Sequence, residues 1–444
     1  MQSLMAATRA VHFAALIALF GEFVFLIWVA DATVRGDEWA ALAQRAVRMA
    51  GWSITVAVLS GVLWLGLEAA EMSGAGAAAA WDGPTLGMVI IDTRFGHAWS
   101  VRLVLALAIA LVLTLARATI GRSRPLARTV ALLSGVLLAT VAWAGHAAGE
   151  RGTDRIVHLS ADAMHLAAAG AWLGALPSFA SLLANASKAS TPEFAGIAAR
   201  RFSTLGVVSV GTLVITGIVN AWYTVGSMPA LVATPYGRLL LLKLLLFGAM
   251  LALAAINRLW LTRRLTAGRD AWAARQLQRN AIAETALGVA VLAVVGVLGI
   301  TTSAAHVYAE PMSGHARAAF GRTADPREAT RTIRIEMGDD MRFMPADIRV
   351  KRGEVVRFLV ENKGKLMHEM VLGTLDELQA HAAMMGQHPD MEHDAQPAPN
   401  ELQVGPGKSG ELGWQFTAAG AFYYGCLVPG HLEAGMIGKV LVTN

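Results

Sequence analysis

Long apolar runs alternate with short polar segments along the first 303 residues of the chain. Eight of these runs are about 20 residues long and almost free of charge, which is the length that an α-helix needs to cross a bilayer. We expect membrane-spanning helices at residues 8–30, 48–70, 99–118, 128–148, 157–182, 203–225, 237–260 and 281–303. The pattern therefore predicts an α-helical polytopic membrane domain of about eight transmembrane helices.

After Ser303 the pattern changes to an alternation of apolar and polar residues with a period of two. "TIRIEM" and "DIRVKRGEVVRFLVEN" show it most clearly, and "HEMVLG", "SGELGWQFTAAGAFYYGC" and "GMIGKVLVTN" continue it. Such alternation is typical of half-buried strands, and Gly353 marks a bulge or turn. About seven short strands favour an all-β Greek-key sandwich. We therefore expect a membrane domain at residues 1–304, a linker at 305–330 and a β domain at 331–444.

Composition and charge give the membrane domain an orientation. Hydrophobic residues make up 55% of the chain and its mean hydropathy is +0.49, which excludes an ordinary soluble protein. Alternate loops contain sixteen Lys and Arg residues, whereas the opposite side has seven, at Arg9, Arg94, Arg102, Arg151, Arg155, Arg238 and Lys243. The positive-inside rule puts the first set in the cytoplasm, so both termini lie outside it. The first apolar run is long for a signal peptide, and we interpret it as a helix.

The β domain differs from the rest of the chain in charge and contains its single cysteine. Residues 325–444 carry 12 Lys and Arg against 17 Asp and Glu, so this part is acidic although the whole chain has a net charge of +5. Nothing in the pattern of basic residues indicates nucleic-acid binding. With one cysteine, Cys426, the chain has no internal disulfide, and a free thiol outside the cytoplasm is a liability unless a metal occupies it.

The stretch "CLVPGHLEAGM" places three soft or borderline metal ligands within eleven residues. Cys426 would end one strand, and His431 and Met436 would lie on the loop that follows, while His368 opens an earlier strand. Two imidazoles, a thiolate and a weak axial thioether form the trigonal copper site that is suited to electron transfer. The bland alternative is that Cys426 is only a small buried hydrophobe.

A second group of copper ligands interrupts the strands. The insertion "ELQAHAAMMGQHPDMEHDAQPAPN" contains thioethers and imidazoles, which together suit Cu(I). The candidate ligands are His381, Met384, Met385, His388, Met391 and His393. The segment also fits a polar loop with a short amphipathic helix. Met337, Met341 and Met344 either join this site or pack in the core.

Histidines gather towards the outer side of the membrane domain. In "HLSADAMHLAAAGAWLG" the offsets of His158, Asp162, His165 and Trp172 place them on one helical face. Polar residues inside a span usually face a pathway or a partner, so we expect a membrane copper path there. Its candidate residues are His97, His146, His158, Asp162 and His165. Hydrogen bonding at the membrane interface is the alternative role, and Glu22 in the first run is a further proton or ion candidate.

The β domain resembles the cupredoxin family of plastocyanin, azurin and rusticyanin. "MRFMPADIRVKRGEVVRFLVEN", "MHEMVLG" and "CLVPGHLEAGMIGKV" are most similar to the periplasmic copper-tolerance cupredoxins of the CopI type. The resemblance implies a type 1 copper site at His368, Cys426, His431 and Met436. One departure concerns Glu369, which stands where azurin and plastocyanin carry Asn. It affects the hydrogen bonding around the site, and so its colour and potential.

The membrane domain resembles the copper-resistance protein D (CopD) family. "DTRFGHAWSVRL", "HLSADAMHLAAAGAWLGALPSF", "LVITGIVNAWYTVGS" and "TPYGRLLLLKLLLFGAMLALAAINR" carry the similarity. The resemblance implies a multi-pass protein of the bacterial inner membrane that is linked to copper uptake and tolerance. Of the path residues, it carries over His146, His158, Asp162 and His165.

Together the two resemblances imply a copper homeostasis and resistance protein rather than an enzyme. In this interpretation a periplasmic cupredoxin captures or oxidises copper and passes it to the membrane domain, which transports it, in the direction of import. Its partners would be copper ions, the lipid membrane, and periplasmic copper chaperones or a redox partner.

A redox interpretation stays open beside this one. Membrane histidines on paired helices ligate haem in some proteins, and a cupredoxin would then accept electrons from a quinol or from haem. A binuclear copper centre is excluded, because it needs two cysteines and the chain has one.

Overall fold

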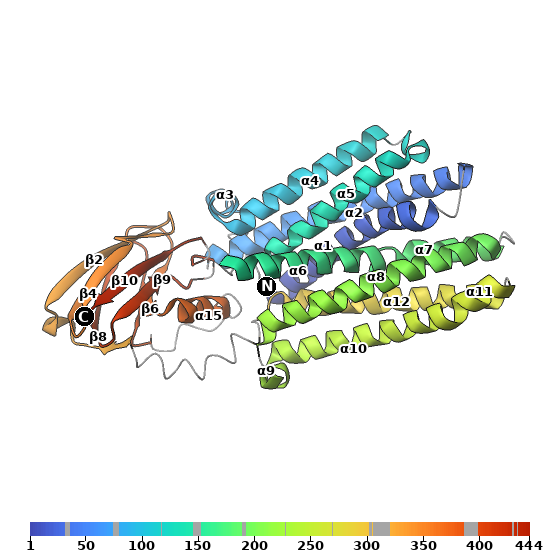
Figure 1. Cartoon of the computed structure of the whole chain (residues 1–444). Coiled ribbons are helices and arrows are strands. Elements are labelled where there is room, and N and C mark those ends of the chain that lie inside the picture. The colour runs from blue at the N-terminus through green and yellow to red at the C-terminus, as the bar shows by residue number, and fades with distance from the viewer. Residues whose placement is uncertain are drawn as a thin grey trace. The chain divides into compact units, whose positions relative to one another are not determined.

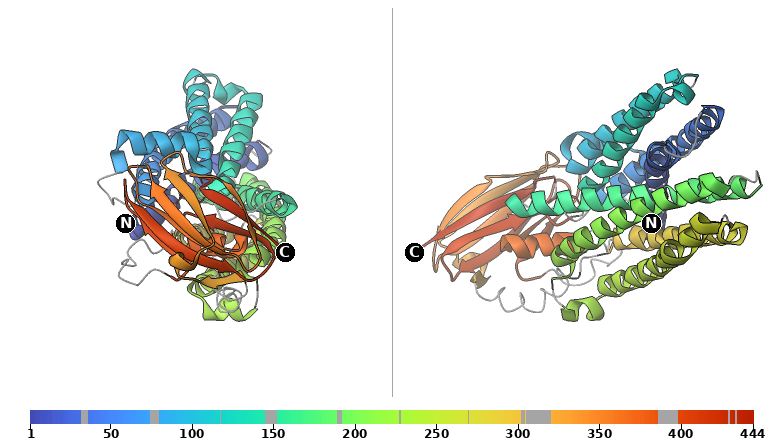
Figure 2. Two further views of the ribbon diagram at one scale, coloured as in Figure 1. Left: turned by 90° about the vertical axis from the view of Figure 1, so that its left-hand side faces the viewer. Right: turned by 45° about the vertical axis from the view of Figure 1, so that its right-hand side comes forward.

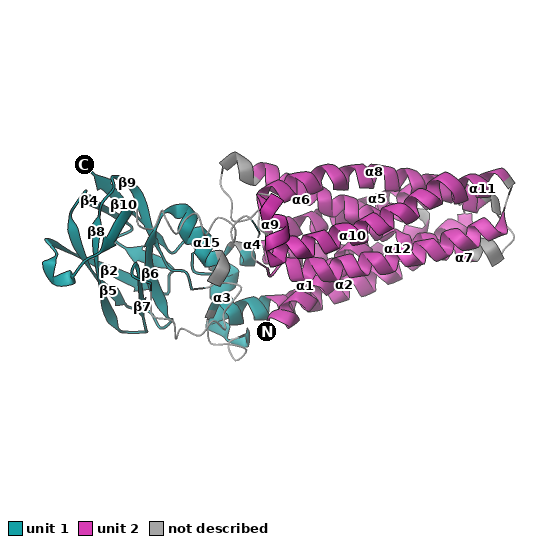
Figure 3. Ribbon diagram, turned by 90° about the horizontal axis from the view of Figure 1, so that it is seen from below, with its two compact units in different colours: residues 1, 65–97, 302–444 teal, residues 2–64, 98–301 magenta. Residues whose placement is uncertain are grey.

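The computed structural model describes most of the chain as two compact units. The described residues are 1–31, 36–73, 80–116, 118–144, 152–188, 192–226, 228–268, 270–301, 304, 320–385, 398–428, 430–432 and 434–444. One unit comprises Met1, Leu65–His97 and Thr302–Asn444, and the other comprises Gln2–Trp64 and Ala98–Thr301 (Figure 3).

The described residues contain eight helices that are long and apolar enough to cross a membrane, as the apolar runs predict. Their bounds are Gln2–Ala30, Gly36–Met72, Phe95–Ala116, Arg124–Trp143, Ile156–Ala184, Phe194–Val225, Pro235–Ala267 and Ala271–Leu298. These spans are built by α1 (Gln2–Val24), η1 (Phe25–Ala30), α2 (Gly36–Ser73), α4 (Arg94–Ala116), α5 (Arg124–Ala139), η4 (Thr140–Ala144), α6 (Gly152–Leu173), α7 (Leu176–Lys188), α8 (Pro192–Val225), α10 (Pro235–Ile256), η6 (Asn257–Leu261), α11 (Thr262–Gly268) and α12 (Ala271–Leu298) (Figure 1). The short helices α3 (Gly83–Asp92), η3 (Ile120–Arg122) and α9 (Met228–Ala233) lie between spans.

Helices of the second unit pack side by side around α1, α6 and α12 (Figures 1 and 2). Helix α6 lies against α8, α1 and α5, and α12 lies against α7, α10 and α1. Small residues allow the closest approaches, since a Cβ atom on Gly21 of α1 would lie 2.2 Å from the backbone carbon of Gly174, between α6 and α7. Because lipid tails are as apolar as leucine, such backbone contact is a main source of helix association in membranes.

The strands lie in two five-stranded sheets (Figures 1 and 2). One has the order β1-β8-β5-β2-β3 and the other β4-β10-β9-β6-β7. Pairs β2–β5 and β4–β10 are parallel. Their bounds are β1 (Gly321–Thr323), β2 (Arg331–Gly338), β3 (Arg342–Met344), β4 (Asp347–Lys351), β5 (Val355–Asn362), β6 (His368–Gly373), β7 (Glu401–Val404), β8 (Ser409–Phe416), β9 (Gly420–Gly425) and β10 (Ile437–Thr443), with the short helices η7 (Pro326–Glu328) and α15 (Leu375–Met385). The predicted β-sandwich is confirmed, and β1 lies within the residues expected to form a linker.

The alternating pattern of the sequence decides which side chains fill the sandwich. Alternate residues of β2, β5 and β10 are buried. They join one core that includes Phe343, Phe358, Phe416 and Tyr424. Gly353 forms the predicted turn before β5 with φ of +85°, a left-handed conformation that favours glycine. The metal-ligand candidates therefore rest on a packed, two-layer scaffold.

Candidate metal centre

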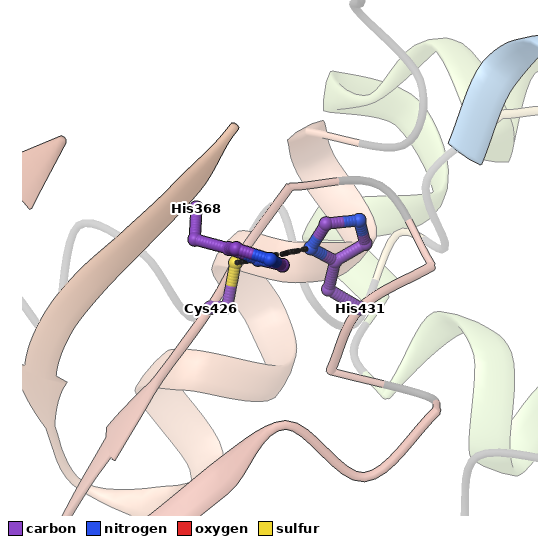
Figure 4. A group of neighbouring side chains, drawn as sticks. All are labelled: His368, Cys426 and His431. Atoms are coloured by element: carbon purple, nitrogen blue, oxygen red, sulfur yellow. Dashed lines mark hydrogen bonds between the residues drawn. The ribbon is translucent and has the colours of Figure 1, made fainter. Parts of the chain in front are cut away.

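Three of the predicted copper ligands converge at one end of the sandwich (Figure 4). His368 is the first residue of β6, Cys426 follows the last residue of β9, and His431 lies on the loop between β9 and β10. The Nδ1 atoms of the two histidines are 3.2 Å apart. The Cys426 Sγ atom lies 3.3 Å from His431 Nδ1 and 4.0 Å from His368 Nδ1. All three residues are buried.

These separations fit one shared metal ion. Ligand atoms that lie about 2.0–2.3 Å from an ion and about 120° apart are roughly 3.5 Å from one another. Burial lowers the pKa of His368, and burial followed by the proximity of His368 lowers the pKa of His431 to about 3. Both imidazoles are therefore neutral at physiological pH and have a lone pair for a metal. Two neutral imidazoles and one cysteine thiolate form an N₂S ligand set that suits copper.

Met436 is tied to this group through the backbone. The Cys426 N–H donates to the Met436 carbonyl at 3.1 Å, and the Met436 N–H donates to the His431 carbonyl at 3.0 Å. Its side chain is buried in the same core as Cys426. Gly430 and Gly435 have φ values of +84° and +99°, which allow the loop to turn tightly between Cys426 and Met436. The loop thus holds the backbone of Met436, the predicted axial ligand, beside the backbone of Cys426 and His431.

Asp339 supports His368 from outside the ligand set. Its Oδ1 atom lies 3.2 Å from His368 Nε2, so an imidazole whose Nδ1 faces the metal donates its Nε2–H to this carboxylate. Partial burial opposes ionisation of Asp339, but hydrogen bonds from the N–H groups of Lys365 and Leu366 and from His368 hold its pKa below the ordinary value. The sequence analysis missed Asp339, which precedes His368 by 29 residues.

Glu369, the residue after His368, contacts the thiol of Cys426. Its backbone N–H donates to Cys426 Sγ at 3.4 Å, a contact that does not depend on the side chain. Its carboxyl Oε1 accepts the Leu427 N–H at 3.0 Å. Burial, reinforced by the nearby Glu401, raises the pKa of Glu369 to about 7. Glu369 stands where azurin and plastocyanin carry Asn. Its backbone N–H still donates to the sulfur of Cys426, and its side chain places a buried carboxyl beside that bond.

The second predicted copper site is only partly within the described residues. His381 is half-buried on α15, and Met384 and Met385 belong to the end of that helix. His388, Met391 and His393 lie outside the described residues. Of the methionines of the first hairpin, Met337 and Met341 are in the core and Met344 is exposed. The site stays a prediction.

In the membrane unit, the α6 candidates face α8. His158 stacks on Tyr223 with ring centroids 4.7 Å apart. Asn220 Nδ2 donates to Asp162 Oδ1 at 3.1 Å, and His165 Nδ1 lies 2.9 Å from Thr216 Oγ1. The three residues therefore share one face that is turned into the bundle.

The other membrane candidates have separate surroundings. His97 is exposed and its Nε2 lies 2.7 Å from the Ile91 carbonyl, and His146 lies outside the described residues. His12 bonds through Nδ1 to the Ala57 carbonyl and to Ser60 Oγ. Trp172 is buried and packs edge-on against Phe247.

Lys243 lies inside a helix and not in a loop, contrary to the prediction from the sequence. It was counted among the loop charges, but it is the ninth residue of α10 and interacts electrostatically with Asp162. Arg9 and Arg102 likewise lie within helices, α1 and α4. A single lysine in "LLLLKLLLF" was the available signal, because a charge inside a span needs a partner.

The membrane part of the chain matches a known family. The model "Copper resistance protein D-like, N-terminal domain" matches residues 1–157, and "Copper resistance protein D" matches residues 196–298. Copper resistance protein D of Pseudomonas syringae pv. tomato is 33% identical over 306 residues, which cover 66% of this chain and 94% of that protein. This chain belongs to the copper resistance protein D family.

The C-terminal domain of this family member matches a copper-binding family. Residues 329–443 match the family "Copper binding proteins, plastocyanin/azurin family". The copper-resistant cuproprotein CopI of Rubrivivax gelatinosus is 48% identical over 155 residues, covering 33% of this chain and 92% of CopI. The inner membrane protein YebZ of Escherichia coli is 28% identical over 292 residues, covering 66% of this chain and 96% of YebZ. The CopD-type protein is thus a multi-span membrane protein related to copper resistance and transport, with a copper-binding cupredoxin domain.

Proposed function

We propose that the cupredoxin domain captures copper outside the cytoplasm and passes it to the membrane domain, which imports it. The observation that carries this proposal is the convergence of His368 Nδ1, His431 Nδ1 and Cys426 Sγ within one buried group. His368, Cys426, His431 and Met436 would hold copper, and the Met436 thioether would be the weakest of these ligands. Bound copper would supply one-electron chemistry between Cu(I) and Cu(II), while the chain supplies buried ligands, two neutral imidazoles and one thiolate among them.

The membrane route would begin on the face of α6 that lies against α8. His158, Asp162 and His165 offer two imidazoles and a carboxylate there, and His97 and His146 would receive copper near the outer end. Along a helix, His165 lies about 10 Å beyond His158, at 1.5 Å per residue. An ionised Asp at a lipid-facing position would cost a few kcal/mol, so the bond from Asn220 supports a position inside the bundle. Import is the direction that we propose.

The proposed setting is the bacterial inner membrane, with the cupredoxin in the periplasm. The excess of Lys and Arg in alternate loops supports this orientation. The resemblance of the chain to a relative named as an inner membrane protein supports the compartment. We place the membrane domain at residues 1–304, the linker at 305–330 and the cupredoxin at 331–444. A periplasmic copper chaperone or a redox partner would load the centre.

Optical spectroscopy with metal analysis tests the centre. The purified full-length protein should bind copper and show an intense thiolate-to-Cu(II) band, because Cys426 is the sulfur ligand. Cys426→Ser should remove that band, and Met436→Leu should keep it and raise the potential, since the axial thioether is the weak ligand. A visible band that survives Cys426→Ser would reject the ligand assignment. A haem Soret band in the purified protein would favour electron transfer instead.

The same metal analysis tests the insertion. We propose a copper-loading site at His381, Met384, Met385, His388, Met391 and His393. Replacement of the last five by Ala should lower the copper content and leave the visible band unchanged. If the copper content stays the same, the insertion binds no copper.

A further inference from the structure

The membrane unit contains a buried carboxyl group, that of Glu284, which is separate from the proposed copper route. Glu284 is the fourteenth residue of α12, about 20 Å along the helix at 1.5 Å per residue, and 1% of it is exposed. Its Oε1 atom accepts a hydrogen bond of 2.6 Å from Asn257 Nδ2. Within the described part of the chain, Glu284 has no ion-pair partner. An ionisable residue in a span marks a functional site by default.

A row of amides connects Glu284 with the start of α12. Gln276 donates to Asn280 Oδ1 at 3.1 Å, Asn280 donates to Asn257 Oδ1 at 2.7 Å, and Asn257 donates to Glu284. Gln276, Asn280 and Glu284 are four residues apart and so share one face of α12. Asn257 opens η6, a π-helical turn that continues α10. Such turns inside helices occur frequently at functional sites.

The described charged groups on the elements around α12 have other partners or lie along other parts of the helix, since Arg9 of α1 lies against Gly299 at the C-terminal end of α12. Arg258, next to Asn257, donates to Ser203 on α8, and Glu22 on α1 accepts from Ser178 on α7. Lys243 on α10 interacts with Asp162, His165 on α6 lies beside Thr216, and Arg264 on α11 lies over Trp260 and Trp272. Arg275 and Arg279 of α12 itself are exposed. Because no ion pair with a cation offsets its charge among the described residues, ionised Glu284 in this apolar setting would be costly.

The atoms around Glu284 indicate which ligand would neutralise its buried charge. Neither sulfur nor imidazole belongs to the group, so it does not suit copper. The amide oxygens of Asn257 and Asn280 already accept N–H groups, which leaves the carboxylate oxygens of Glu284 for a ligand. A hard metal cation needs about six oxygens, whereas a proton needs one. The ligand that fits is a proton.

We propose that Glu284 is a proton-binding site through which the membrane domain couples proton movement to copper movement. One O–H bond forms on Glu284 when the proton enters, and the same bond breaks when the proton leaves. Helix α12 is well placed for the coupling, since Gly288, one turn beyond Glu284, packs on Leu173 at the end of α6. Helix α6 carries the proposed copper route, so the coupling rests on the proposed function.

Full-length protein in sealed liposomes tests the coupling. External Cu(I) is supplied, copper and proton movements are followed with enclosed indicators, and a pH gradient is imposed. Wild-type copper movement should respond to the gradient; a one-for-one electroneutral exchange would sustain about a tenfold copper ratio per pH unit. Glu284→Gln keeps an oxygen acceptor for Asn257 but carries no exchangeable acid proton. Its copper movement should lose the response to the gradient.

Glu22→Gln is the matched control. Glu22 is also a buried carboxyl in a span and is the proton candidate that the sequence indicated, but the cationic Arg45 is nearby, so we expect this variant to keep the wild-type response. Loss of the response in Glu22→Gln and not in Glu284→Gln would assign the proton site to Glu22 and overturn the proposal. Infrared spectroscopy adds a readout without copper: the C=O band of a protonated carboxyl should disappear in Glu284→Gln at normal protein abundance.

The outcomes separate the two proposals. Copper movement that ignores the gradient in wild type, or a Glu284→Gln variant that responds normally, overturns the proton coupling and leaves copper transport standing. Absence of copper movement in wild type overturns copper transport and the coupling with it. The infrared band then decides whether Glu284 binds a proton at all.

Discussion

The Nε2 atom of His368 faces away from the proposed copper and lies 3.2 Å from Asp339. A carboxylate in this position makes the imidazole a stronger electron donor, and the additional negative charge favours Cu(II) over Cu(I). Asp339→Asn should therefore raise the reduction potential of the centre. Because Asp339 is partly exposed and screened, we expect a rise on the order of 30 mV, where 59 mV corresponds to a tenfold change for one electron.

Asp340→Asn is the matched control, since it removes the same charge from the neighbouring residue. Protein-film voltammetry of both variants gives the potentials, and the visible spectrum shows whether the copper ligands are intact. If Asp339→Asn and Asp340→Asn shift the potential equally, Asp339 acts only as a distant charge and does not position His368.

At the scale of elements, the α6–α8 pair is the part of the membrane domain with the clearest chemistry. His165 has a hydrogen-bond partner in Thr216 and lies on the same face as Asp162. His165→Ala in the full-length protein should abolish copper-dependent accumulation or tolerance in cells, because the deepest imidazole of the route is lost. Trp172→Ala, which removes packing against Phe247, should mainly lower protein abundance. Normal copper handling by His165→Ala at normal abundance would leave the membrane domain an anchor.

The helices and strands also show which structural features can be predicted from a single sequence. Uncharged runs located the spans, and the alternation in "TIRIEM" and "VVRFLVEN" located strands, because both periods are local properties of the chain. The close spacing of Cys426, His431 and Met436 likewise indicated the copper ligands. Asp339 and the partners of α6 on α8 depend on how distant segments pack, and no local period encodes that. Lys243 was misplaced because a loop count treats every nearby cation alike.

At the scale of the whole molecule, the chain joins a copper-binding domain to a membrane domain. Tethering two domains on one chain gives an effective concentration in the millimolar range when the tether is short, which favours transfer between them over transfer in solution. The central claim is that copper bound at Cys426 is the copper that enters the membrane domain. Cys426 is the only cysteine in the chain, whereas histidines occur in both domains. Replacing this thiol therefore removes a copper ligand from the cupredoxin domain and leaves the ligands of the membrane domain unchanged.

Copper entry into sealed liposomes, at limiting external copper and without an imposed pH gradient, tests this claim most directly. Full-length wild-type protein is compared with Cys426→Ser and with the membrane domain alone. We expect wild type to deliver copper to an enclosed indicator, and both other proteins to deliver it much more slowly at the same abundance. Equal rates for wild type and Cys426→Ser would contradict the account, because copper would then reach the membrane domain without the cupredoxin centre.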